Sequence, residues 1–319
     1  MAHEVESMMY VGKTPWHGLG VSIPDGKKLS IEMAINAAGL DWDVGIRNIF
    51  TKDGNGIPLG ILDRYVTYRK SDNSVLGIVG KNYHPLQNRD AFKWFQPFLD
   101  SGGASIETAG SLKRGSKIWV LVRIKRDPLI VGKEDDMEHY ILLSNSHDGS
   151  LAVRVGFTPI RVVCNNTLCL AHESKASKLL RVKHTSRVHE NLEEIRNTID
   201  LAQREFAATV DQYKRLASRQ INSTDLVKYV KLVFRLNERK RTPGQEKHKK
   251  IVPSVVRLFE GGRGSQIAGE NYWGAYNAVN EYLNYFRGKT QDNTLNSLWF
   301  GDSARLNKKA LNIAMKMAA

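Results

Sequence analysis

The hydrophobic pattern of this chain changes once, near Arg187, and the change divides the sequence into two regions. Before that point, Gly, Asn, Asp and Pro separate short runs that are rich in Val, Ile, Tyr and Trp, as is typical of β-strands. After it, hydrophobic residues recur three or four positions apart, as they do in amphipathic helices. We therefore predict an α+β chain, with a mainly β, antiparallel-sheet domain over residues 1–187 and a helical region over residues 188–319.

Individual elements follow from the same patterns. Two short helices are predicted in the first domain over 30–38 and 89–99, the former with Ser30 as its N-cap. In the helical region, the hydrophobic spacing predicts one long helix over 192–216, a helix capped by Ser223 or Thr224, and helices over 255–259, 272–286 and 304–317. Turn-forming residues at 72–74, 113–115 and 147–149 predict hairpin connections.

The segment 117–126, KIWVLVRIKR, has the clearest strand pattern. Successive side chains of a strand point to opposite faces, so the aliphatic residues of this segment share one face. The other face carries Lys117, Trp119, Leu121, Arg123 and Lys125. This alternation predicts a sheet with one buried face and one basic, solvated face.

The chain carries 47 Lys and Arg against 33 Asp and Glu, a formal net charge of +14. Residues 176–319 contain 26 of the basic and 14 of the acidic side chains, whereas residues 1–175 contain 21 and 19. The excess therefore belongs to the helical region. A charge of this size and asymmetry favours a polyanionic partner over a role in solubility alone. Among such partners, nucleic acid is favoured over an anionic membrane surface. A content of 41% hydrophobic residues excludes a chain that is disordered throughout.

No catalytic or cofactor-binding motif is complete in this sequence. The Gly-Lys-Thr triplets at 12–14 and 288–290 lack the earlier glycine of a phosphate-binding loop, and the nine histidines have no metal-ligand spacing. Cys164 and Cys169 lack the spacing of a redox or zinc pair. We therefore predict no cofactor, no metal ion and no enzymatic activity. The alternative is an enzyme acting on nucleic acid or nucleotide, in which His147, Asp148, Cys164 and Asn165 gather in a pocket.

The N-terminal sequence and the hydropathy predict the compartment. MAHEVESMMY carries acids and no apolar core after a basic start, unlike a secretory signal, and no apolar stretch approaches the length of a membrane span. We expect a cytoplasmic protein with no membrane partner.

Cationic and aromatic residues are the strongest functional signal that remains. Lys and Arg neutralise phosphates, and exposed aromatic rings stack on unpaired bases without a sequence code. The segment 237–250 is free of apolar residues and strongly basic. The prediction requires the candidates to share one face. The nucleic-acid-binding residues predicted in this way are Arg69, Lys113, Arg114, Lys117, Trp119, Arg123, Lys125, Arg154, Arg161, Arg239, Lys240, Arg241, Lys247, Lys249 and Lys250.

Several strings of residues, in this order, carry a family resemblance. They are Thr14-Pro15-Trp16-His17-Gly18-Leu19-Gly20, Gly80-Lys81-Asn82-Tyr83 followed by Gln87-Asn88, Thr108-Ala109-Gly110-Ser111-Leu112, Ser146-His147-Asp148-Gly149-Ser150, 158–168, 273–279 and 299–301. With them the chain resembles the phage/plasmid-like protein family, domain of unknown function 932. The resemblance implies a habitat on phages and plasmids, and hence a bacterial host cytoplasm. It supplies no established active site.

Cargo of mobile elements often includes recombination proteins. The predicted order of β-hairpin, helix and β-hairpin with a basic sheet is similar in outline to single-strand annealing proteins, including the ring-forming Rad-fifty-two type. An annealing protein needs a positive groove that repeats around an oligomer, and it needs no catalytic residues. We therefore expect a homo-oligomer, ring or filament, that binds single-stranded DNA and anneals strands without nucleotide hydrolysis. A further alternative is a host-takeover factor whose basic half docks on an acidic host protein.

Overall fold

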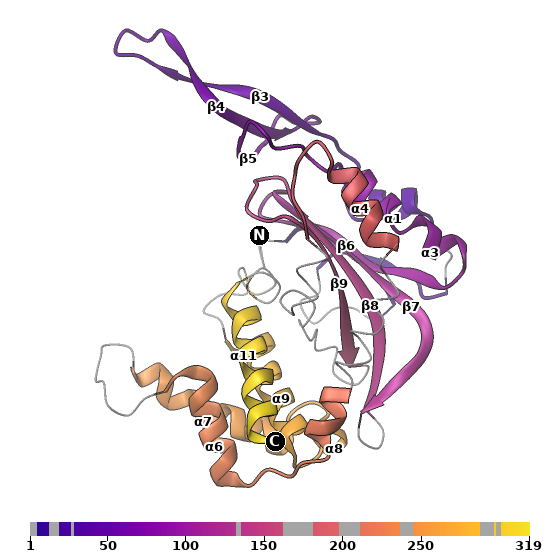
Figure 1. Cartoon of the computed structure of the whole chain (residues 1–319), viewed down its shortest axis with the longest axis vertical. Coiled ribbons are helices and arrows are strands. Elements are labelled where there is room, and N and C mark those ends of the chain that lie inside the picture. Colours follow the sequence, from indigo (N-terminus) through magenta and orange to yellow (C-terminus); the bar gives the residue numbers. More distant parts are fainter. Residues whose placement is uncertain are drawn as a thin grey trace. The chain divides into compact units, whose positions relative to one another are not determined.

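The computed structural model describes residues 5–12, 19–26, 29–131, 135–161, 181–197, 211–236, 245–287, 297 and 301–319. Its strands and helices confirm the predicted α+β class. In chain order they are β1 (Val5–Val11), β2 (Val21–Ile23), α1 (Ile31–Ala37), β3 (Val44–Lys52), β4 (Pro58–Arg69), β5 (Val75–Gly80), α2 (Asn88–Lys93), α3 (Gln96–Asp100), β6 (Ala104–Leu112), β7 (Lys117–Val131), β8 (Asp135–Ser146), β9 (Val153–Arg161), β10 (Arg181–Val182), α4 (Val188–Asn197), α6 (Ser223–Phe234), α7 (Gln245–Gly261), α8 (Ser265–Ala268), α9 (Tyr272–Glu281), the π-helical turn η3 (Tyr282–Phe286) and α11 (Asp302–Met317) (Figure 1).

The chain forms two compact units, each assembled from separate stretches of sequence. Unit 1 comprises Met1–Lys125, Tyr140–Gly156 and Ser174–Asp200, and unit 2 comprises Arg126–His139, Phe157–Glu173 and Leu201–Ala319. Most strands belong to unit 1, and the helices from residue 211 onward belong to unit 2.

A seven-stranded sheet in the order β10-β9-β8-β7-β6-β1-β2 forms the larger sheet of the chain. β1 runs parallel to β2 and antiparallel to β6, which in turn runs antiparallel to β7. α1 contacts β1 and β6, and α3 contacts β6. The predicted N-cap of α1 is confirmed, because the Ser30 hydroxyl accepts a hydrogen bond from the Met33 amide at 3.2 Å.

The single helix predicted over 89–99 is two short helices, α2 and α3. Pro97 lies in the first turn of α3, where its missing amide hydrogen costs no helical hydrogen bond. Trp94 and Phe95 connect the two helices, and both side chains are buried. The junction between the two helices therefore places two large rings in the core of unit 1.

The predicted solvated, basic face of the sheet is wrong over residues 117–122 of β7, which are all buried. Ile118 and Trp119 point to opposite faces, yet each is only 1% exposed. Trp119 stands opposite Gly110 of β6, and a Cβ at Gly110 would lie 2.6 Å from the Trp119 ring. Both faces are covered at this point, so strand alternation alone does not identify a solvated side.

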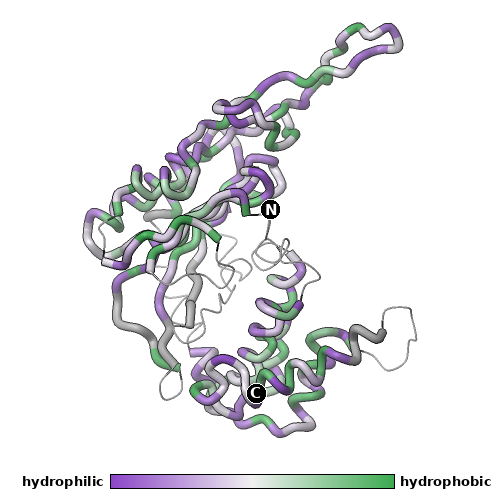
Figure 2. Tube along the Cα trace, turned by 180° about the vertical axis from the view of Figure 1, so that it is seen from behind, coloured by the Kyte–Doolittle hydropathy of each residue, from purple (hydrophilic) through white to green (hydrophobic). Residues whose placement is uncertain are grey.

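A second sheet of three strands, in the order β3-β4-β5, extends into a two-stranded arm beyond the end of β5. The arm is prominent in Figure 1 and carries hydrophobic residues toward its tip (Figure 2). Its pairing shifts between Asn48, opposite Tyr65, and Phe50, opposite Gly60, so that residues 61–64 of β4 stand against Ile49 alone. This bulge includes Asp63 with a φ of 56°, in the left-handed region.

The turn after β8 rests directly on β5. A Cβ at Gly77 would lie 2.4 Å from the Cα of Asp148, so only glycine allows this approach. The Thr67 hydroxyl of the neighbouring strand β4 donates a hydrogen bond to the carbonyl oxygen of His147 at 2.6 Å. The 147–150 turn is thereby fixed to the second sheet of unit 1.

Unit 2 is organised around α9, all of whose residues are buried. Tyr213, Trp273 and Tyr276 form an aromatic cluster, in which the Tyr213 and Trp273 ring centroids are 4.6 Å apart. The Tyr229 hydroxyl donates to the Ala310 carbonyl at 3.2 Å, which connects α6 to α11. These contacts give the helical unit a core of its own.

Helix boundaries in unit 2 differ from the predicted ones. Asn222, not Ser223 or Thr224, caps α6, because its side-chain oxygen accepts from the Asp225 amide at 2.8 Å. α7 is longer than the predicted 255–259, and Pro253 lies within it. Of the long helix predicted over 192–216, α4 and residues 211–217 are helical, and 198–210 lie outside the described residues.

We predict that Gly77→Ala lowers the free energy of unfolding by about 1–3 kcal/mol, because the added methyl group overlaps the Asp148 backbone. Gly80→Ala on the same strand is the matched control, since a Cβ there meets no atom within 4 Å. Urea denaturation of both variants measures the difference. Equal stabilities of the two variants would contradict the assigned contact between β5 and the 147–150 turn.

Candidate nucleic-acid interface

Carboxylates within unit 1 neutralise two of the predicted phosphate-binding arginines. The Arg69 guanidinium donates to both carboxylate oxygens of Glu6 at 2.6 and 2.7 Å, and it lies 4.4 Å from the Trp42 ring centroid. The Arg123 guanidinium pairs with Glu107 at 2.9 Å. Both arginines connect parts of the fold and present little free charge to an external anion.

The remaining predicted residues of the sheet do not form one continuous surface. Lys117 and Trp119 are buried, so the Trp119 ring has no exposed face for stacking on a base. Arg154 is half-buried and has a partner within the molecule. Lys113, Arg114 and Lys125 are exposed, but the first two lie in the β6–β7 turn and Lys125 lies toward the other end of that strand pair. Nucleic-acid binding by these three stays a prediction.

The basic segment 237–250, which runs into α7, contributes one described side chain. Lys250 is exposed on α7. The structure does not describe Arg239, Lys240 and Arg241 at all, or the side chains of Arg161, Lys247 and Lys249.

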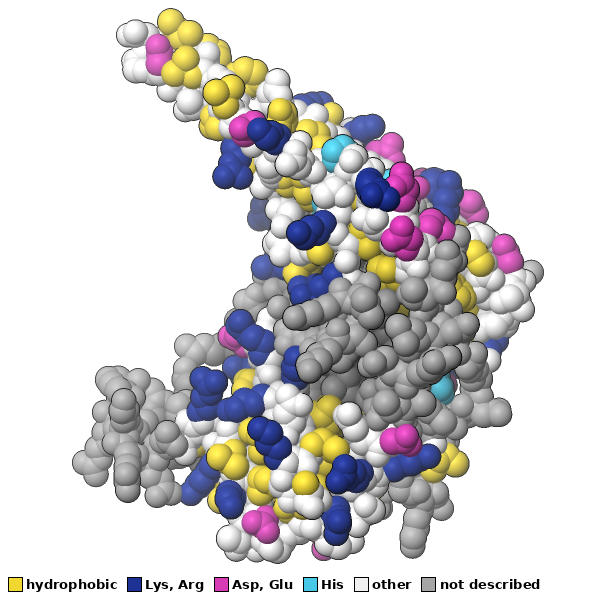
Figure 3. Space-filling model, viewed as in Figure 1, with side chains coloured by type: hydrophobic (Ala, Val, Ile, Leu, Met, Phe, Trp, Pro, Cys, Tyr) yellow, Lys and Arg dark blue, Asp and Glu magenta, His cyan; other side chains and the backbone are white. Residues whose placement is uncertain are grey.

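Unit 2 presents further cations that no sequence motif marks. They are exposed, and none forms an ion pair with a carboxylate among the described residues. Figure 3 shows Lys and Arg side chains gathered over the helices of this unit, with few Asp and Glu between them. The charge asymmetry of the sequence was the signal that could have found them. The set, which we call the helical cation set, consists of Lys214, Arg215, Arg219, Lys228, Arg235, Arg257 and Lys316.

Lys309 shows how closely cations approach one another in this unit. Its ammonium donates to the Leu232 and Val233 carbonyls at 2.6 and 2.7 Å, which satisfies acceptors at the C-terminal end of α6. Burial, and then the positive charge of Arg235, lower the pKa of Lys309. The end of α6 is therefore an electropositive point on the surface.

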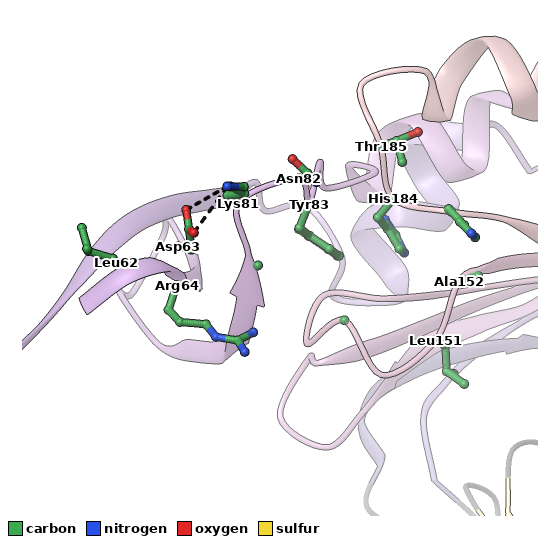
Figure 4. Close-up of a pocket in the computed structure, with 13 residues that line it drawn as sticks. Leu62, Asp63, Arg64, Lys81, Asn82, Tyr83, Leu151, Ala152, His184 and Thr185 are labelled. Atoms are coloured by element: carbon green, nitrogen blue, oxygen red, sulfur yellow. Dashed lines mark hydrogen bonds and ion pairs between the residues drawn. The ribbon is translucent and has the colours of Figure 1, made fainter. Parts of the chain in front are cut away.

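Unit 1 contains an open cavity of about 690 Å³ (Figure 4). Four segments line it: residues 62–64 of the β4 bulge, residues 80–83 after β5, the turn at 149–152, and residues 183–185. Arg64, Lys81 and Lys183 supply positive charge, and Asp63 supplies one carboxylate, which pairs with Lys81 at 3.3 Å. The cavity therefore has an excess of positive charge on its lining.

Tyr83 and His184 form a stacked pair beside this cavity, with ring centroids 4.6 Å apart. The Tyr83 hydroxyl donates to the Ser146 carbonyl at 2.7 Å, and burial, aided by Asp148, raises its pKa. His184 contacts the His84 carbonyl through Nδ1 at 3.1 Å, and burial lowers the pKa of its imidazole. Both rings are therefore neutral at physiological pH.

The alternative pocket of His147, Asp148, Cys164 and Asn165 is only partly described, because the last two lie outside the described residues. His147 is fully buried, and its Nε2 forms a hydrogen bond with Asn88 Oδ1 at 2.9 Å. Burial lowers its pKa to about 3, with a smaller contribution from His184. An imidazole enclosed in this way serves the fold and is not accessible to a substrate.

A family model described as a domain of unknown function (DUF932) matches residues 75–307, which is most of the chain. The chain belongs to the DUF932 family. This match confirms the resemblance drawn from the residue strings at the level of that domain. No curated protein and no solved structure matches the chain. Two of the strings of this DUF932 protein, 80–83 and 146–150, meet at the cavity of unit 1.

None of the helices among the described residues has the length and the apolar character needed to span a membrane. Within the same residues, no group of three or more His, Cys, Asp or Glu side chains is arranged to hold a metal ion.

The buried His147 predicts a pH dependence of stability. The unfolded chain binds a proton at this residue near its ordinary pKa of 6.5, whereas the folded protein does so only near about 3. The contribution of the neutral His147 to the free energy of unfolding is therefore present above pH 6.5. It falls as the pH drops, by about 2 kcal/mol between about pH 7 and pH 5. Chemical denaturation across this range measures the slope, and His147→Gln should remove about that much of it. Parallel slopes for both proteins would contradict the assignment.

Proposed function

We propose that this DUF932 protein is a single-stranded DNA-binding, strand-annealing recombination protein of a phage or plasmid, which acts as an oligomer without nucleotide hydrolysis. The observation that carries the proposal is the helical cation set of unit 2, whose members are exposed and have no carboxylate partners among the described residues. Such cations bind phosphates by releasing counterions, and this binding is independent of sequence.

The distribution of charge favours nucleic acid over a compact anionic partner. In unit 1, carboxylates hold two of the predicted phosphate-binding arginines in place, as Glu6 holds Arg69 and Glu107 holds Arg123. In unit 2, cations belong to several helices and to the turn after residue 217, so the positive surface is extended. A polynucleotide backbone repeats its charge along its length and therefore suits an extended surface.

The order of elements in unit 1 supports annealing by analogy. The hairpin β4–β5, the helices α2 and α3, and the hairpin β6–β7 follow one another, as in the outline of Rad-fifty-two-type annealing proteins. Annealing requires that phosphates be held while bases stay free to pair, and surface lysines and arginines provide this kind of contact. The phage and plasmid context comes from the family resemblance of the sequence.

We predict that affinity for a labelled oligothymidylate falls steeply as the salt concentration rises. The triple variant Lys214→Gln/Arg215→Gln/Arg219→Gln should reduce the slope of the logarithm of the association constant against the logarithm of the salt concentration by about 2, at about 0.7 for each lost phosphate contact. The matched control is Lys70→Gln/Arg89→Gln/Arg187→Gln, which removes the same charge from exposed cations that already pair with Asp43, Asp41 and Glu190. The control should keep the original slope. Affinity that is indifferent to salt would exclude the proposal.

We further predict that the protein accelerates pairing of two complementary oligonucleotides in the absence of nucleoside triphosphates. The Lys214→Gln/Arg215→Gln/Arg219→Gln variant should be slower than the control variant, because it holds phosphates less tightly. Stopped-flow fluorescence measures the rate, and electron microscopy of the same mixtures should show rings or filaments. Uniform monomeric particles with no gain in rate would contradict the proposal.

A further inference from the structure

We propose that the cavity of unit 1 binds a nucleoside phosphate, with Arg64 and Lys183 on the phosphate and the Tyr83–His184 pair alongside the base. The choice of ligand rests on the proposed function and gives that function a defined second contact. The cavity volume of about 690 Å³ falls within the range of small-molecule sites in proteins, about 300–1,000 Å³.

The β4 bulge directs Arg64 toward the cavity. Asp63 adopts the left-handed conformation, and the pairing of β4 with β5 begins at the next residue, Arg64, which stands directly opposite Gly80. Cross-strand partners share a face of the sheet, so the missing side chain at Gly80 leaves the space beside Arg64 open. A Cβ at Gly80 would meet no atom within 4 Å. Figure 4 shows the Arg64 guanidinium extending from the strand into this space.

The charges around the cavity favour an anion. Arg64 and Lys183 are exposed and form no ion pair with any described carboxylate. Lys81 and Asp63 neutralise each other across an exposed pair that contributes little to stability. Asp148 lies near enough to Tyr83 and His184 to influence them, but it is not part of the lining. The planar guanidinium of Arg64 can donate two parallel hydrogen bonds to one phosphate.

The aromatic pair gives the cavity a second recognition element. Tyr83 is half-buried and His184 is 9% exposed, so Tyr83 offers the larger ring surface to the cavity. Both rings are neutral, and their stack is fixed by hydrogen bonds to the Ser146 and His84 carbonyls. Aromatic rings stack on nucleobases of any sequence. Asn82 and Thr185 add polar groups at the same lining. An anionic group next to a flat, neutral wall matches a nucleotide better than it matches inorganic phosphate.

A nucleoside phosphate can come from a free nucleotide or from one unit of a DNA strand. Titration calorimetry at low salt with thymidine 5′-monophosphate and with a thymidine tetranucleotide separates these sources, and thymidine without phosphate serves as the reference. Arg64→Gln should weaken binding by about tenfold or more, because it removes a charged hydrogen-bond donor from the phosphate. Thymidine should bind the wild-type protein no more tightly than the phosphate-bearing probes bind the Arg64→Gln variant.

Gly80→Glu tests the same contact without removing Arg64, since the new carboxylate stands directly opposite the guanidinium and competes for it. It should weaken binding as much as Arg64→Gln does. The control, Arg47→Gln, should bind like the wild-type protein, because it removes a cation outside the cavity that lies 3.8 Å from the Tyr68 ring centroid and donates to Asn73.

If Arg64→Gln weakens binding of the monophosphate, the result supports a free nucleotide as the ligand. If Arg64→Gln weakens binding of the tetranucleotide alone, the result assigns the site to a DNA strand. Absence of binding by both probes, or affinities unchanged in Arg64→Gln and Gly80→Glu, overturns the inference. Salt-dependent binding of a long oligonucleotide would survive that result and leave the proposed function standing. Arg64-dependent binding of the monophosphate without long-oligonucleotide binding would overturn the proposed function and keep the cavity site.

Discussion

Unit 1 depends on a buried imidazole that stays neutral. Asn88 donates through its amide nitrogen to the Leu40 and Trp42 carbonyls, so its oxygen is left to accept from His147 Nε2. The His147 amide donates to Ser116, and its carbonyl accepts from Thr67. One residue therefore joins α2, the β6–β7 turn and β4. Protonation would place a positive charge in this buried site, away from water. Burial therefore lowers the pKa of His147 and keeps the ring neutral.

That connection also determines where the cavity lies. The turn after His147 supplies residues 149–152 to the lining, and β4, which Thr67 ties to the same turn, supplies the bulge with Arg64. Gly77 lets the turn approach β5 closely, and Gly80, at the end of that strand, leaves space in front of Arg64. The same contacts that stabilise the fold therefore hold the walls of the cavity in place.

Sequence patterns predicted the local features of this fold and missed those that depend on distant residues. Periodicity and capping gave α1, and turn formers gave the connections at 72–74, 113–115 and 147–149. Alternation along β7 could not show that Trp119 is covered, because the residues that cover a sheet face lie elsewhere in the chain. Arg69 is neutralised by Glu6, which is 63 positions away. Tyr83 and His184 are even farther apart in sequence, so the cavity was not predictable from motifs.

The two kinds of positive site would have different consequences for a DNA strand. In the proposed function, the cations of unit 2 would hold phosphates without contacting bases, and such contacts slide and exchange readily. A cavity that stacks a base removes that base from pairing while it is occupied. If each cavity takes one base, a strand held by an oligomer would lose one base for each occupied cavity and keep the others free. Brief anchoring at spaced positions is therefore compatible with annealing, whereas continuous stacking along the strand would oppose it.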